Sequence, residues 1–481
     1  MKKRHLLILS MGMLCTLHGY SQNDIDAMRY SQITFGGTAR FNSMAGSMGA
    51  LGGDISTLSF NPAGIGVFRK SEFTLSPSVF FQSTTSNYKD VNSTDNRLNF
   101  NFGNIGLVAT FRLKDTTSGW RSLNFGFGYN RTNNFYNRIS TMGNNTTSSL
   151  LDTYVSDANG QNPKNFDSFS TGLAYDAYLI NPLPTDSTHY DHVIKHYGEL
   201  QNKSTESKGS MGETDLSFGG NYRDILFVGA TVGIVNARYI ENYTYSESDE
   251  KDTIKNFKSF TLKQFLDSKG NGINFKIGLI VKPTDWLRVG AAVHTPTKIS
   301  MNDVYYNSMY SNIESKTYSI ESPDGNFNYS ITTPFRAMGS VAFVINKFGL
   351  LNAEYEYVNY RNAHLNSSPN VFTDVNKYIR DQYVSAGNLR IGGEVRIDPI
   401  AFRAGYALYG SPYKSGLNKD AGRNSYTAGI GFRKNFFFID FAFVLNKRTD
   451  YSYLYDPNFN NAVVKNNYTS SSYVFTFGLR F

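Results

Sequence analysis

The chain has 481 residues, of which 15% are aromatic and only 18% charged, with a formal net charge of +8. Soluble domains carry about 25% charged residues, and a disordered chain would contain few aromatic residues. Beyond the first 20 residues, no apolar run approaches the ~18 residues that a membrane-spanning helix needs. These values exclude a helical membrane protein and a disordered chain, and they favour an all-β fold rich in glycine and aromatic residues.

The first 21 residues have the layout of a secretory signal peptide. Met1–Arg4 is basic, His5–Leu17 is mostly apolar, and the small residues Gly19 and Ser21 are two apart. We therefore predict a signal peptide over residues 1–21, cleaved after Ser21, with a buried N-terminal helix as the alternative. Cys15 is the only cysteine, so the mature chain is expected to have no disulfide and no thiolate chemistry.

The charge of the mature chain is mild. Removing Lys2, Lys3 and Arg4 leaves 44 basic residues (47 − 3) against 39 acidic ones, a net charge of +5. No block of lysine and arginine of the nucleic-acid-binding type occurs, so we expect no nucleic-acid partner.

The last ten residues alternate with period two. Tyr473, Phe475, Phe477, Leu479 and Phe481 fall on one face, and Val474, Thr476, Gly478 and Arg480 fall on the other. A strand in a membrane barrel is apolar toward the lipid and free to be polar toward the lumen. An arginine on the lipid face at mid-bilayer would cost roughly 2–4 kcal/mol, so Arg480 should point inward. A terminal phenylalanine after such alternation resembles the signal read by the outer-membrane barrel assembly machinery.

The same alternation recurs upstream and predicts fourteen strands. We place them near residues 71–82, 98–114, 121–131, 213–222, 225–245, 271–282, 286–303, 326–346, 348–360, 386–398, 400–410, 424–434, 436–449 and 472–481. Connections after even-numbered strands are short, and those after odd-numbered strands are long and polar, the longest being residues 132–212. This alternation is typical of a bacterial outer-membrane β-barrel with periplasmic turns and extracellular loops.

A barrel of fourteen antiparallel strands lies between small barrels that side chains fill and large barrels that enclose an aqueous channel. We therefore predict that residues 22–70 fold back into the lumen as an N-terminal hatch, and that residues 71–481 form the transmembrane barrel. A periplasmic tail is the alternative for the first of these segments.

The segment from Gly37 to Asp54, rich in Gly, Ala and Met, and the following Leu58–Gly64 resemble the N-terminal hatch of the FadL/TodX family. The resemblance implies a fourteen-stranded outer-membrane barrel that transports long-chain fatty acids or other hydrophobic compounds and releases them sideways at a kinked third strand. Asn61, Pro62 and Ala63 match the hatch tripeptide of the family, and Gly64 follows it. Related chains are often labelled hemin receptors, and one relative serves protein secretion.

Two groups of apolar residues are candidates for ligand binding. Phe227 and Phe438, with Val235 and Val444, should face the lumen, where they would line a dry route for an apolar ligand or pack against the plug. The segment from Leu173 to Ile180 is apolar within a polar loop. It would form a landing groove as a short helix or pack on the barrel rim, through Leu173, Tyr175, Tyr178, Leu179 and Ile180.

Glycine and proline residues suggest where the wall bends. Gly126 and Gly128 in strand 3 would permit the kink of a lateral gate, and Pro77 interrupts strand 1, where a structural bulge is the alternative. Pro296 and Pro334 are interpreted as bends at the outer rim of adjacent strands 7 and 8.

Three of the five mature histidines, His189, His192 and His196, lie within eight residues of the longest loop. On a helix, the spacing i, i+3, i+7 would place them on one face, where neutral imidazole binds zinc, copper or haem iron. Metal or hemin capture is therefore one hypothesis, and a solvated polar loop is the other.

No motif of a metalloprotease, serine hydrolase or P-loop enzyme is present. We expect a non-enzymatic outer-membrane transporter without a cofactor, which takes up hydrophobic compounds passively, fatty-acid-like amphiphiles in particular. Its expected partners are that ligand, outer-membrane lipid and lipopolysaccharide, and the barrel assembly machinery. The alternatives are a secretion-accessory barrel that binds cargo, and hemin or metal acquisition through the histidine loop.

Overall fold

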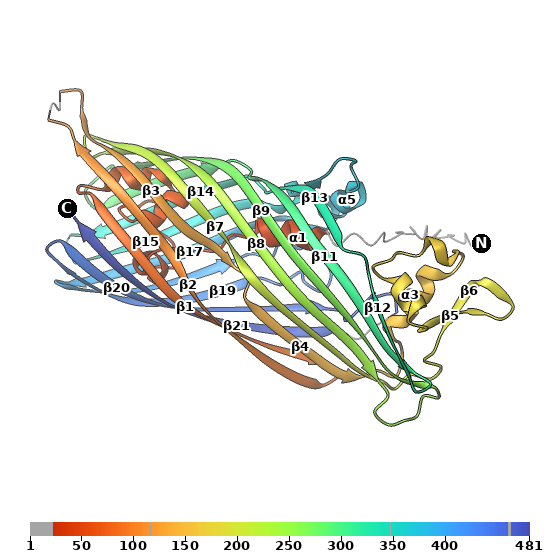
Figure 1. The fold of residues 1–481 in the computed structure, drawn as a ribbon. Helices are drawn as coiled ribbons and strands as arrows, with labels where there is room; N and C mark the ends of the chain where they lie inside the picture. The colour runs from red at the N-terminus through yellow and green to blue at the C-terminus, as the bar shows by residue number, and fades with distance from the viewer. Residues whose placement is uncertain (1–22, 115–116, 347, 460–462) are drawn as a thin grey trace, which may run out of the picture.

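A computed structural model describes residues 23–481 except 115–116, 347 and 460–462. The predicted signal peptide, residues 1–21, lies outside the described residues. The described chain forms one closed antiparallel barrel, with helices inside the lumen and beyond one rim (Figure 1). Within this part of the chain, no helix has the length and apolar character needed to cross a bilayer.

Fourteen antiparallel wall segments, each made of one strand or of consecutive interrupted strands, form the barrel, as the sequence predicts. We call each of them a stave. Ten are single strands: β1 (Glu72–Tyr88), β2 (Val91–Arg112), β7 (Leu200–Tyr222), β8 (Leu226–Ser248), β9 (Phe257–Val281), β17 (Ser385–Ile397), β18 (Ile400–Tyr409), β19 (Arg423–Lys434), β20 (Phe437–Ser452) and β21 (Val464–Arg480). The first and last close the barrel, since β1 pairs with β21 from Glu72↔Arg480 to Asn87↔Lys465.

The other four staves are interrupted. The third is β3 (Trp120–Asn134) with β4 (Asn137–Asn144), and the seventh is β10 (Leu287–His294) with β11 (Lys298–Ile313). The eighth combines β12 (Lys316–Glu321), β13 (Gly325–Thr332) and β14 (Arg336–Ile345), and the ninth is β15 (Gly349–Asn359) with β16 (His364–Asn366). Interruptions of this kind bend a strand and disturb its ladder of hydrogen bonds.

The alternation of side chains gives the barrel an apolar outer belt. On β21, Phe475 and Phe477 are 42% and 48% exposed on the outer face, while Thr476 between them is fully buried on the inner face. Arg480 points inward and its Nε lies 2.7 Å from Oε2 of Glu72. An outer face of this composition fits a barrel that spans a lipid bilayer.

Several strands are longer than a bilayer requires. A transmembrane strand needs about 9–11 residues, whereas β9 has 25. The excess projects beyond the rim with the long loops (Figure 1). There, α3 (Leu150–Ala158), η3 (Pro163–Asn165), α4 (Thr171–Asp176), β5 (Ile180–Leu183) and β6 (Asp186–His192) form what we call the cap, and α5 (Thr373–Gln382) lies near η4 (Tyr360–Asn362).

Residues 23–69, which we call the hatch, lie mainly inside the lumen. They form α1 (Asp24–Ser31), α2 (Ala39–Ser43), η1 (Ile55–Ser59) and η2 (Pro62–Val67). Thr38 caps α2 by accepting a hydrogen bond from Phe41 N, and Asn61 caps η2, where Pro62 occupies the first position. Nearly every side chain from Gly37 to Gly66 is buried, so the hatch fills the lumen at this level.

Candidate transport pathway

Inward-facing glycines of the wall, among them Gly229, Gly290 and Gly392, contact the backbone of the hatch. We call this set of contacts the seat of the hatch. A β-carbon at Gly392 would lie 2.6 Å from Met44 O, one at Gly290 would lie 2.7 Å from Gly49 O, and one at Gly229 would collide with Pro62 O. Real β-carbons do not approach other atoms this closely. The hatch backbone therefore packs directly on the wall at these positions, where any larger residue would displace it.

The tripeptide Asn61-Pro62-Ala63 joins the hatch to itself and to the wall. Asn61 donates from Nδ2 to Gly49 O (2.7 Å) and to Leu279 O of β9 (3.3 Å), while its Oδ1 accepts from Ala63 N (3.1 Å). Gly64 N donates to Asn61 O, and Gly64 O accepts from Gly53 N. This motif thus holds two distant turns of the hatch together against β9.

Wall carboxylates provide further anchors. Glu354 accepts from Gly49 N (2.8 Å), Glu394 accepts from Nε of Arg40 (3.4 Å), and Asp215 accepts from the Ser59 hydroxyl. Near the rim that carries the short turns, Arg403 also bridges Glu394 and Asp440, at 2.6 Å each. The lumen on this side of the hatch is consequently lined by buried ion pairs.

On the side of the hatch that faces the long loops lies a cavity of about 460 Å³, which we call the chamber. Ligand pockets commonly measure about 300–1,000 Å³, so the chamber has room for a small amphiphile. Hatch residues 28–37 form one of its sides. Its lining mixes apolar side chains with polar ones, among them Gln82, Asn101, Arg131, Asn133, Tyr409 and Arg423.

Backbone pairing between β2 and the third stave ends partway along the chamber. The β2–β3 ladder extends from Arg112↔Ser122 only to Asn104↔Asn130. Beyond that pair, β2 continues to Val91 in register with β1, while the third stave bulges between Arg131 and Asn133 and stops at Asn134. We call this interval without backbone pairing, between β2 residues 96–103 and residues 131–139, the β2–β3 gap. The side chain of Arg97 reaches across it to the ring of Tyr136 (5.9 Å) and to Glu206 (2.9 Å).

Contacts at both ends delimit this gap. At the end of the gap where the β2–β3 ladder stops, Asn104 Nδ2 donates to Asn130 Oδ1 (2.7 Å). At the opposite end, toward the β1–β2 hairpin, Ser140 Oγ donates to Asp95 Oδ2 (2.5 Å). Outside it, Leu98 and Phe100 are 65% and 61% exposed on the outer face of β2. Unpaired backbone at membrane depth is tolerated where it lines a cavity, and both edges of the gap line the chamber.

The hatch closes the gap from within. A β-carbon on Gly36 would collide with the carbonyl of Arg131, and one on Gly103, the bulged residue of β2 opposite Pro77, would lie 3.3 Å from Gly37 O. Gly37 has a φ of +134°, which side chains disfavour. Gly36-Gly37 therefore passes between the two edges as a strip of bare backbone.

The expected gate residues lie near the gap rather than in it. Pro77 occupies a bulge of the β1–β2 ladder, in agreement with the structural alternative. Gly126 and Gly128 lie in regularly paired backbone, facing Leu58 and Ile55 of the hatch, so they do not make the kink. The third stave instead bends from Arg131 to Tyr136, because a bulged residue and a break in the strand follow one another there.

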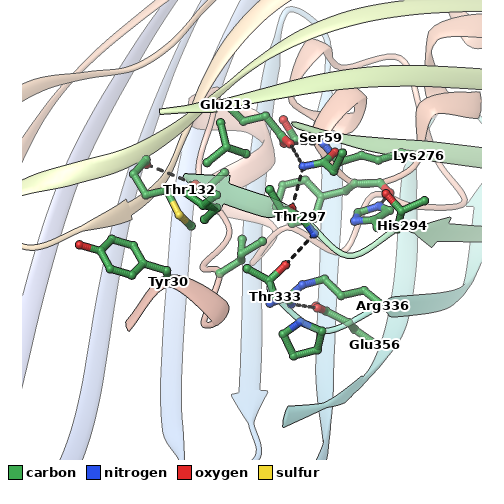
Figure 2. Close-up of a pocket in the computed structure, with 18 of the residues that line it drawn as sticks. Tyr30, Ser59, Thr132, Glu213, Lys276, His294, Thr297, Thr333, Arg336 and Glu356 are labelled. Carbon is green, nitrogen blue, oxygen red and sulfur yellow. Dashed lines mark hydrogen bonds and ion pairs between the residues drawn. The ribbon is translucent and has the colours of Figure 1, made fainter. Parts of the chain in front are cut away.

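A second, smaller cavity lies between the hatch and wall strands β3, β7 to β11, β14 and β15 (Figure 2). It holds about 30 Å³, the space of roughly one water molecule. Lys276 Nζ lies 2.5 Å from Glu213 and 3.3 Å from Asp215, and His294 bonds Phe60 O (2.6 Å). In this conformation the small cavity is too tight for a ligand.

The prolines expected to bend the rim lie beside this small cavity. Residues 295–297 interrupt the seventh stave, and residues 333–335 interrupt the eighth stave at the same level. Thr297 and Thr333 hold the two interruptions together with hydrogen bonds of 2.9 Å. Since both staves continue beyond these points, Pro296 and Pro334 are bends within the wall rather than at its rim.

The two lumenal phenylalanines face inward but do not line the chamber. Phe227 packs against Ala63 and Val67 of the hatch and Ile280 of the wall. The ring of Phe438 contacts the guanidinium groups of Arg433 (4.9 Å) and Arg480 (5.2 Å) near the rim that carries the short turns. Of the four expected lumenal residues, Val444 lines the chamber and Val235 the small cavity.

The apolar loop segment is largely enclosed within the cap. Leu173, Leu179 and Ile180 are at most 2% exposed and pack in one cluster with Leu151. Tyr175 is half-buried at the edge of this cluster, while Tyr178 is 53% exposed and lies 4.7 Å from the ring of Tyr318. Only Tyr178 of this group presents a large exposed surface, so the segment is mostly core rather than an open groove.

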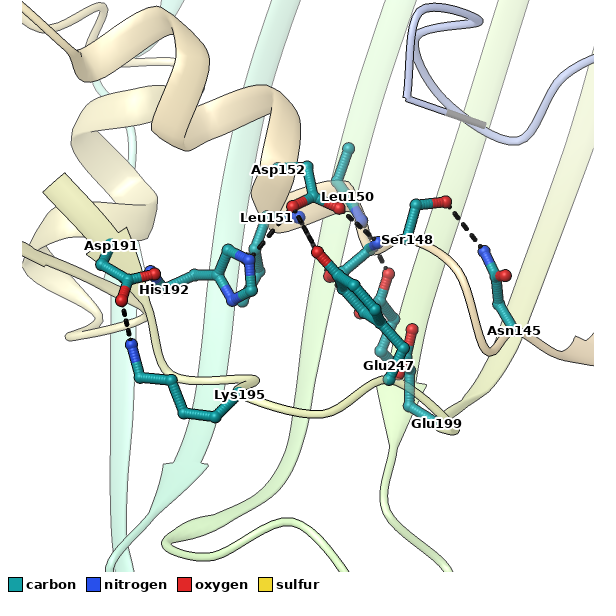
Figure 3. A network of polar contacts seen from close by, with 12 residues as sticks. Asn145, Ser148, Leu150, Leu151, Asp152, Asp191, His192, Lys195, Glu199 and Glu247 are labelled. Atoms are coloured by element: carbon teal, nitrogen blue, oxygen red, sulfur yellow. Dashed lines mark hydrogen bonds and ion pairs between the residues drawn. The ribbon is translucent and has the colours of Figure 1, made fainter. Parts of the chain in front are cut away.

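The three histidines do not share a helical face, and that expectation is wrong. His189 and His192 belong to β6, where residues three apart lie on opposite faces. His192 contacts Asp152 of α3 (3.1 Å; Figure 3). His189 contacts Asp186 (2.8 Å), and His196 is exposed. Among the described residues, no three His, Cys, Asp or Glu side chains are grouped as a metal site.

A buried acidic pair fastens the cap to the barrel (Figure 3). Glu247, near the end of β8, accepts from Leu150 N (2.8 Å), from the hydroxyl of Tyr245 (2.6 Å) and from Ser149. Gln201 donates from Nε2 to both Glu247 (3.1 Å) and Glu199 (3.3 Å). Burial, together with the neighbouring Glu199 carboxylate, raises the pKa of Glu247 to about 8.

Sequence reasoning misses Gly36, Gly103, Arg131 and the inward-facing glycines of the wall. A usable signal exists only for the wall glycines, which recur at inward positions of predicted strands. The gap has no such signal, because it depends on where two neighbouring strands stop pairing.

No family model and no curated protein match the sequence. Solved structures do match the fold. The toluene transporter TodX of Pseudomonas putida aligns with a TM-score of 0.56 and 12% identity, covering 93% of this chain and 99% of that one. A Pseudomonas aeruginosa FadL homologue aligns at 0.54 and 14%, covering 94% and 98%. The Ralstonia pickettii toluene transporter TbuX aligns at 0.51 and 14%, covering 93% and 99%. The chain therefore has the FadL-type fold.

Proposed function

We propose that this chain is an outer-membrane transporter for passive uptake of hydrophobic compounds, with fatty-acid-like amphiphiles as the preferred cargo. The observation that carries the proposal is the β2–β3 gap, an interruption of strand pairing that lies between a chamber of ligand size and the apolar outer belt. Toluene transporters and a FadL homologue share the fold, and this likeness supports the same class of activity.

Lateral release follows from the polarity of the two exits. An axial path would cross the hatch and then the buried ion pairs around Glu394 and Arg403. Apolar surface gains about 25 cal/mol per Å² on leaving water, and a charged lining offers no such gain. The gap leads instead to Leu98, Phe100 and Phe102 on the lipid-facing side of β2. The chain contains no energy-coupling motif that we recognise, so a concentration gradient would drive uptake.

In this scheme the hatch is the gate. Gly36-Gly37 closes the gap by packing bare backbone against Arg131 and Gly103. A shift of this strip away from the wall opens the chamber to the membrane, while the seat around Asn61-Pro62-Ala63 holds the rest of the hatch in place. Gating thus requires movement of a short segment, and the lumen stays plugged.

The absence of cysteine beyond Cys15 permits a direct test. Asn101→Cys with Asn133→Cys places one thiol on each edge of the gap, and a bifunctional thiol reagent then ties the edges together. The matched control, Leu107→Cys with Phe127→Cys, ties the same two staves where they are regularly paired. We expect cross-linking of the first pair to reduce fatty-acid uptake into proteoliposomes to the level of protein-free vesicles, with the control unaffected. Unchanged uptake in both would contradict lateral release.

A further inference from the structure

The outer face of the barrel has a hollow of about 680 Å³ over β8, which we call the furrow. Its floor is formed by Ala230 and Val232 of β8. Ala230 is small, and it lies directly opposite Phe218 on one neighbouring strand and Ile277 on the other. The larger side chains that flank the floor are Leu216 and Phe218 of β7 and Phe275 and Ile277 of β9.

The furrow belongs to the apolar outer belt. Its lining is apolar apart from Ser217, Thr231 and Lys276, whose side chains are buried on the inner face. The outward residues of β8 are apolar from Leu226 to Ile234, a run that matches the ~9–11 residues of a transmembrane strand. The furrow therefore faces hydrocarbon, where a lipid chain occupies it unless another protein covers it.

Two cations lie beyond the furrow, toward the long loops. Arg238 of β8 and Lys269 of β9 are directly opposite each other and are 54% and 59% exposed. Asp267 contacts both, at 3.0 Å from Arg238 and 3.4 Å from Lys269, but one carboxylate neutralises only one of the two charges. Lys298 of the adjoining strand β11 is exposed as well. Since like charges opposite each other on neighbouring strands destabilise a sheet, this cluster favours a bound anion.

The spacing between the furrow and Arg238 matches one leaflet of a bilayer. Arg238 follows Val232 by six residues (238 − 232) on the same face of β8, which is about 20 Å along a strand at ~3.3 Å per residue. Strands of outer-membrane barrels tilt by roughly 35–45°, so this length rises about 15 Å across the membrane, half of a hydrocarbon core of about 30 Å. The long loops of such barrels are extracellular, and the leaflet is then the outer one.

We propose that the outer face of β7, β8 and β9 binds one phosphate-bearing lipid of the outer leaflet, with its phosphate on Arg238 and Lys269 and an acyl chain in the furrow. Arg238 directs Nε and Nη2 toward Asp267, which leaves its Nη1 donors for a phosphate oxygen. Guanidinium and ammonium groups both suit phosphate in charge and in hydrogen bonding. The site lies outside the lumen, so it goes beyond the proposed transport function.

The test is native mass spectrometry of the full-length mature protein in a mild detergent, titrated with dipalmitoyl phosphatidic acid or with dipalmitoylglycerol, which lacks the phosphate. We expect the first lipid to bind at least tenfold more tightly than the second. Arg238→Gln with Lys269→Gln should lower the affinity for phosphatidic acid about tenfold or more, as for loss of hydrogen bonds to a charged group. The matched control is Lys447→Gln with Lys465→Gln, which removes two exposed lysines from β20 and β21.

Further variants test the chain and the charge separately. Ala230→Phe places a ring on the floor of the furrow and should lower the affinity for dipalmitoyl phosphatidic acid several-fold. Dihexanoyl phosphatidic acid, whose chains are too short to reach the furrow, should bind this variant as it binds the wild type. Ala428→Phe, at an exposed alanine of β19 outside the furrow, is the control. Arg238→Lys with Lys269→Arg keeps both charges and should retain most of the affinity.

Three outcomes would overturn the proposal. Equal affinity for the two dipalmitoyl lipids, or no loss in the double glutamine variant, would remove the phosphate site. Full competition by inorganic phosphate, with no effect of Ala230→Phe, would indicate an anion site without a lipid. A wild-type dimer that Ala230→Phe converts to monomers would assign the furrow to a second copy of this chain. Because none of these measurements involves uptake, the lipid site and the proposed transport function are tested separately.

Discussion

At the scale of single residues, the smallest side chains of the wall determine where the hatch sits. Gly229 and Gly278 contact Pro62 and Asn61, and Gly392 and Gly405 contact Met44. These glycines lie on strands far apart in the sequence, yet they face one hatch of about 45 residues. Their shared role explains part of the high glycine content, which composition alone attributes only to a β fold.

A valine at Gly229 should disturb this seat. Its β-carbon would collide with Pro62 O, and overpacking of this kind typically costs about 1–3 kcal/mol. We expect Gly229→Val to displace the hatch, to raise leakage of small polar solutes in a liposome-swelling assay, and to lower the unfolding temperature. Gly339→Val is the control, because a β-carbon there meets no atom within 4 Å. Equal behaviour of both variants would show that the hatch does not depend on this contact.

At the scale of elements, two local structures decide what the long loop and the third stave can do. The histidine segment is the strand β6, because it pairs with β5 from Ile180↔His192 to Leu183↔Asp186. Its residues alone also suit a helix, so the spacing of the histidines was misleading. Likewise, Gly126 and Gly128 suit a kink, but the bend occurs where Thr132 is bulged beside β7.

The acidic pair predicts that attachment of the cap weakens at alkaline pH. The pKa of Glu247 is raised from its ordinary value to about 8 by burial and by Glu199, so its stabilising effect is complete below pH ~4.5 and is lost as pH rises through 8. We expect limited proteolysis of the cap to be faster at pH 9 than at pH 6. Glu247→Gln cannot ionise and should show a smaller difference. An equal pH effect in both proteins would refute the role of this pair.

At the scale of the whole molecule, an apolar belt surrounds a polar lumen that the hatch plugs. The belt is continuous around the barrel because each stave alternates with period two, and β1 closes against β21. Ion pairs line the lumen beside the hatch, and the hatch backbone packs on the inward-facing glycines of the wall. The gap is the place in this arrangement where chamber and belt adjoin, and it gives the molecule its proposed direction of release.

Membrane insertion of the belt predicts a depth-dependent penalty for charge. Phe475 lies on the outer face of β21, five residues before the strand ends at Arg480, which is near the centre of the ~9–11 residues that cross a bilayer. An arginine there should destabilise the barrel by roughly 2–4 kcal/mol, falling to about 0–1 kcal/mol near the interface. We expect Phe475→Arg to lower the free energy of unfolding in lipid vesicles by the larger amount, and Phe436→Arg, in an exposed turn, by the smaller. Similar losses at both positions would mean that Phe475 does not face hydrocarbon.

Much of the fold was predictable from the sequence, because the relevant information is local. Alternation along β21 or β9 identifies a strand and both of its faces, and short turns after even-numbered strands establish the direction of the barrel. The Asn61-Pro62-Ala63 motif likewise indicated a hatch. The burial of Thr476 beside exposed Phe475 follows from period two alone.

The pathway depended on contacts between residues distant in the chain. The seat needs glycines from several strands to meet one hatch, and the gap exists because β2 stays with β1 while the third stave bends away. Arg131 looks ordinary in sequence, and its lack of a carboxylate partner is apparent only when its surroundings are assembled. Strand pairing, charge compensation and cavity shape are properties of many residues at once, and for that reason only the tertiary structure decided them.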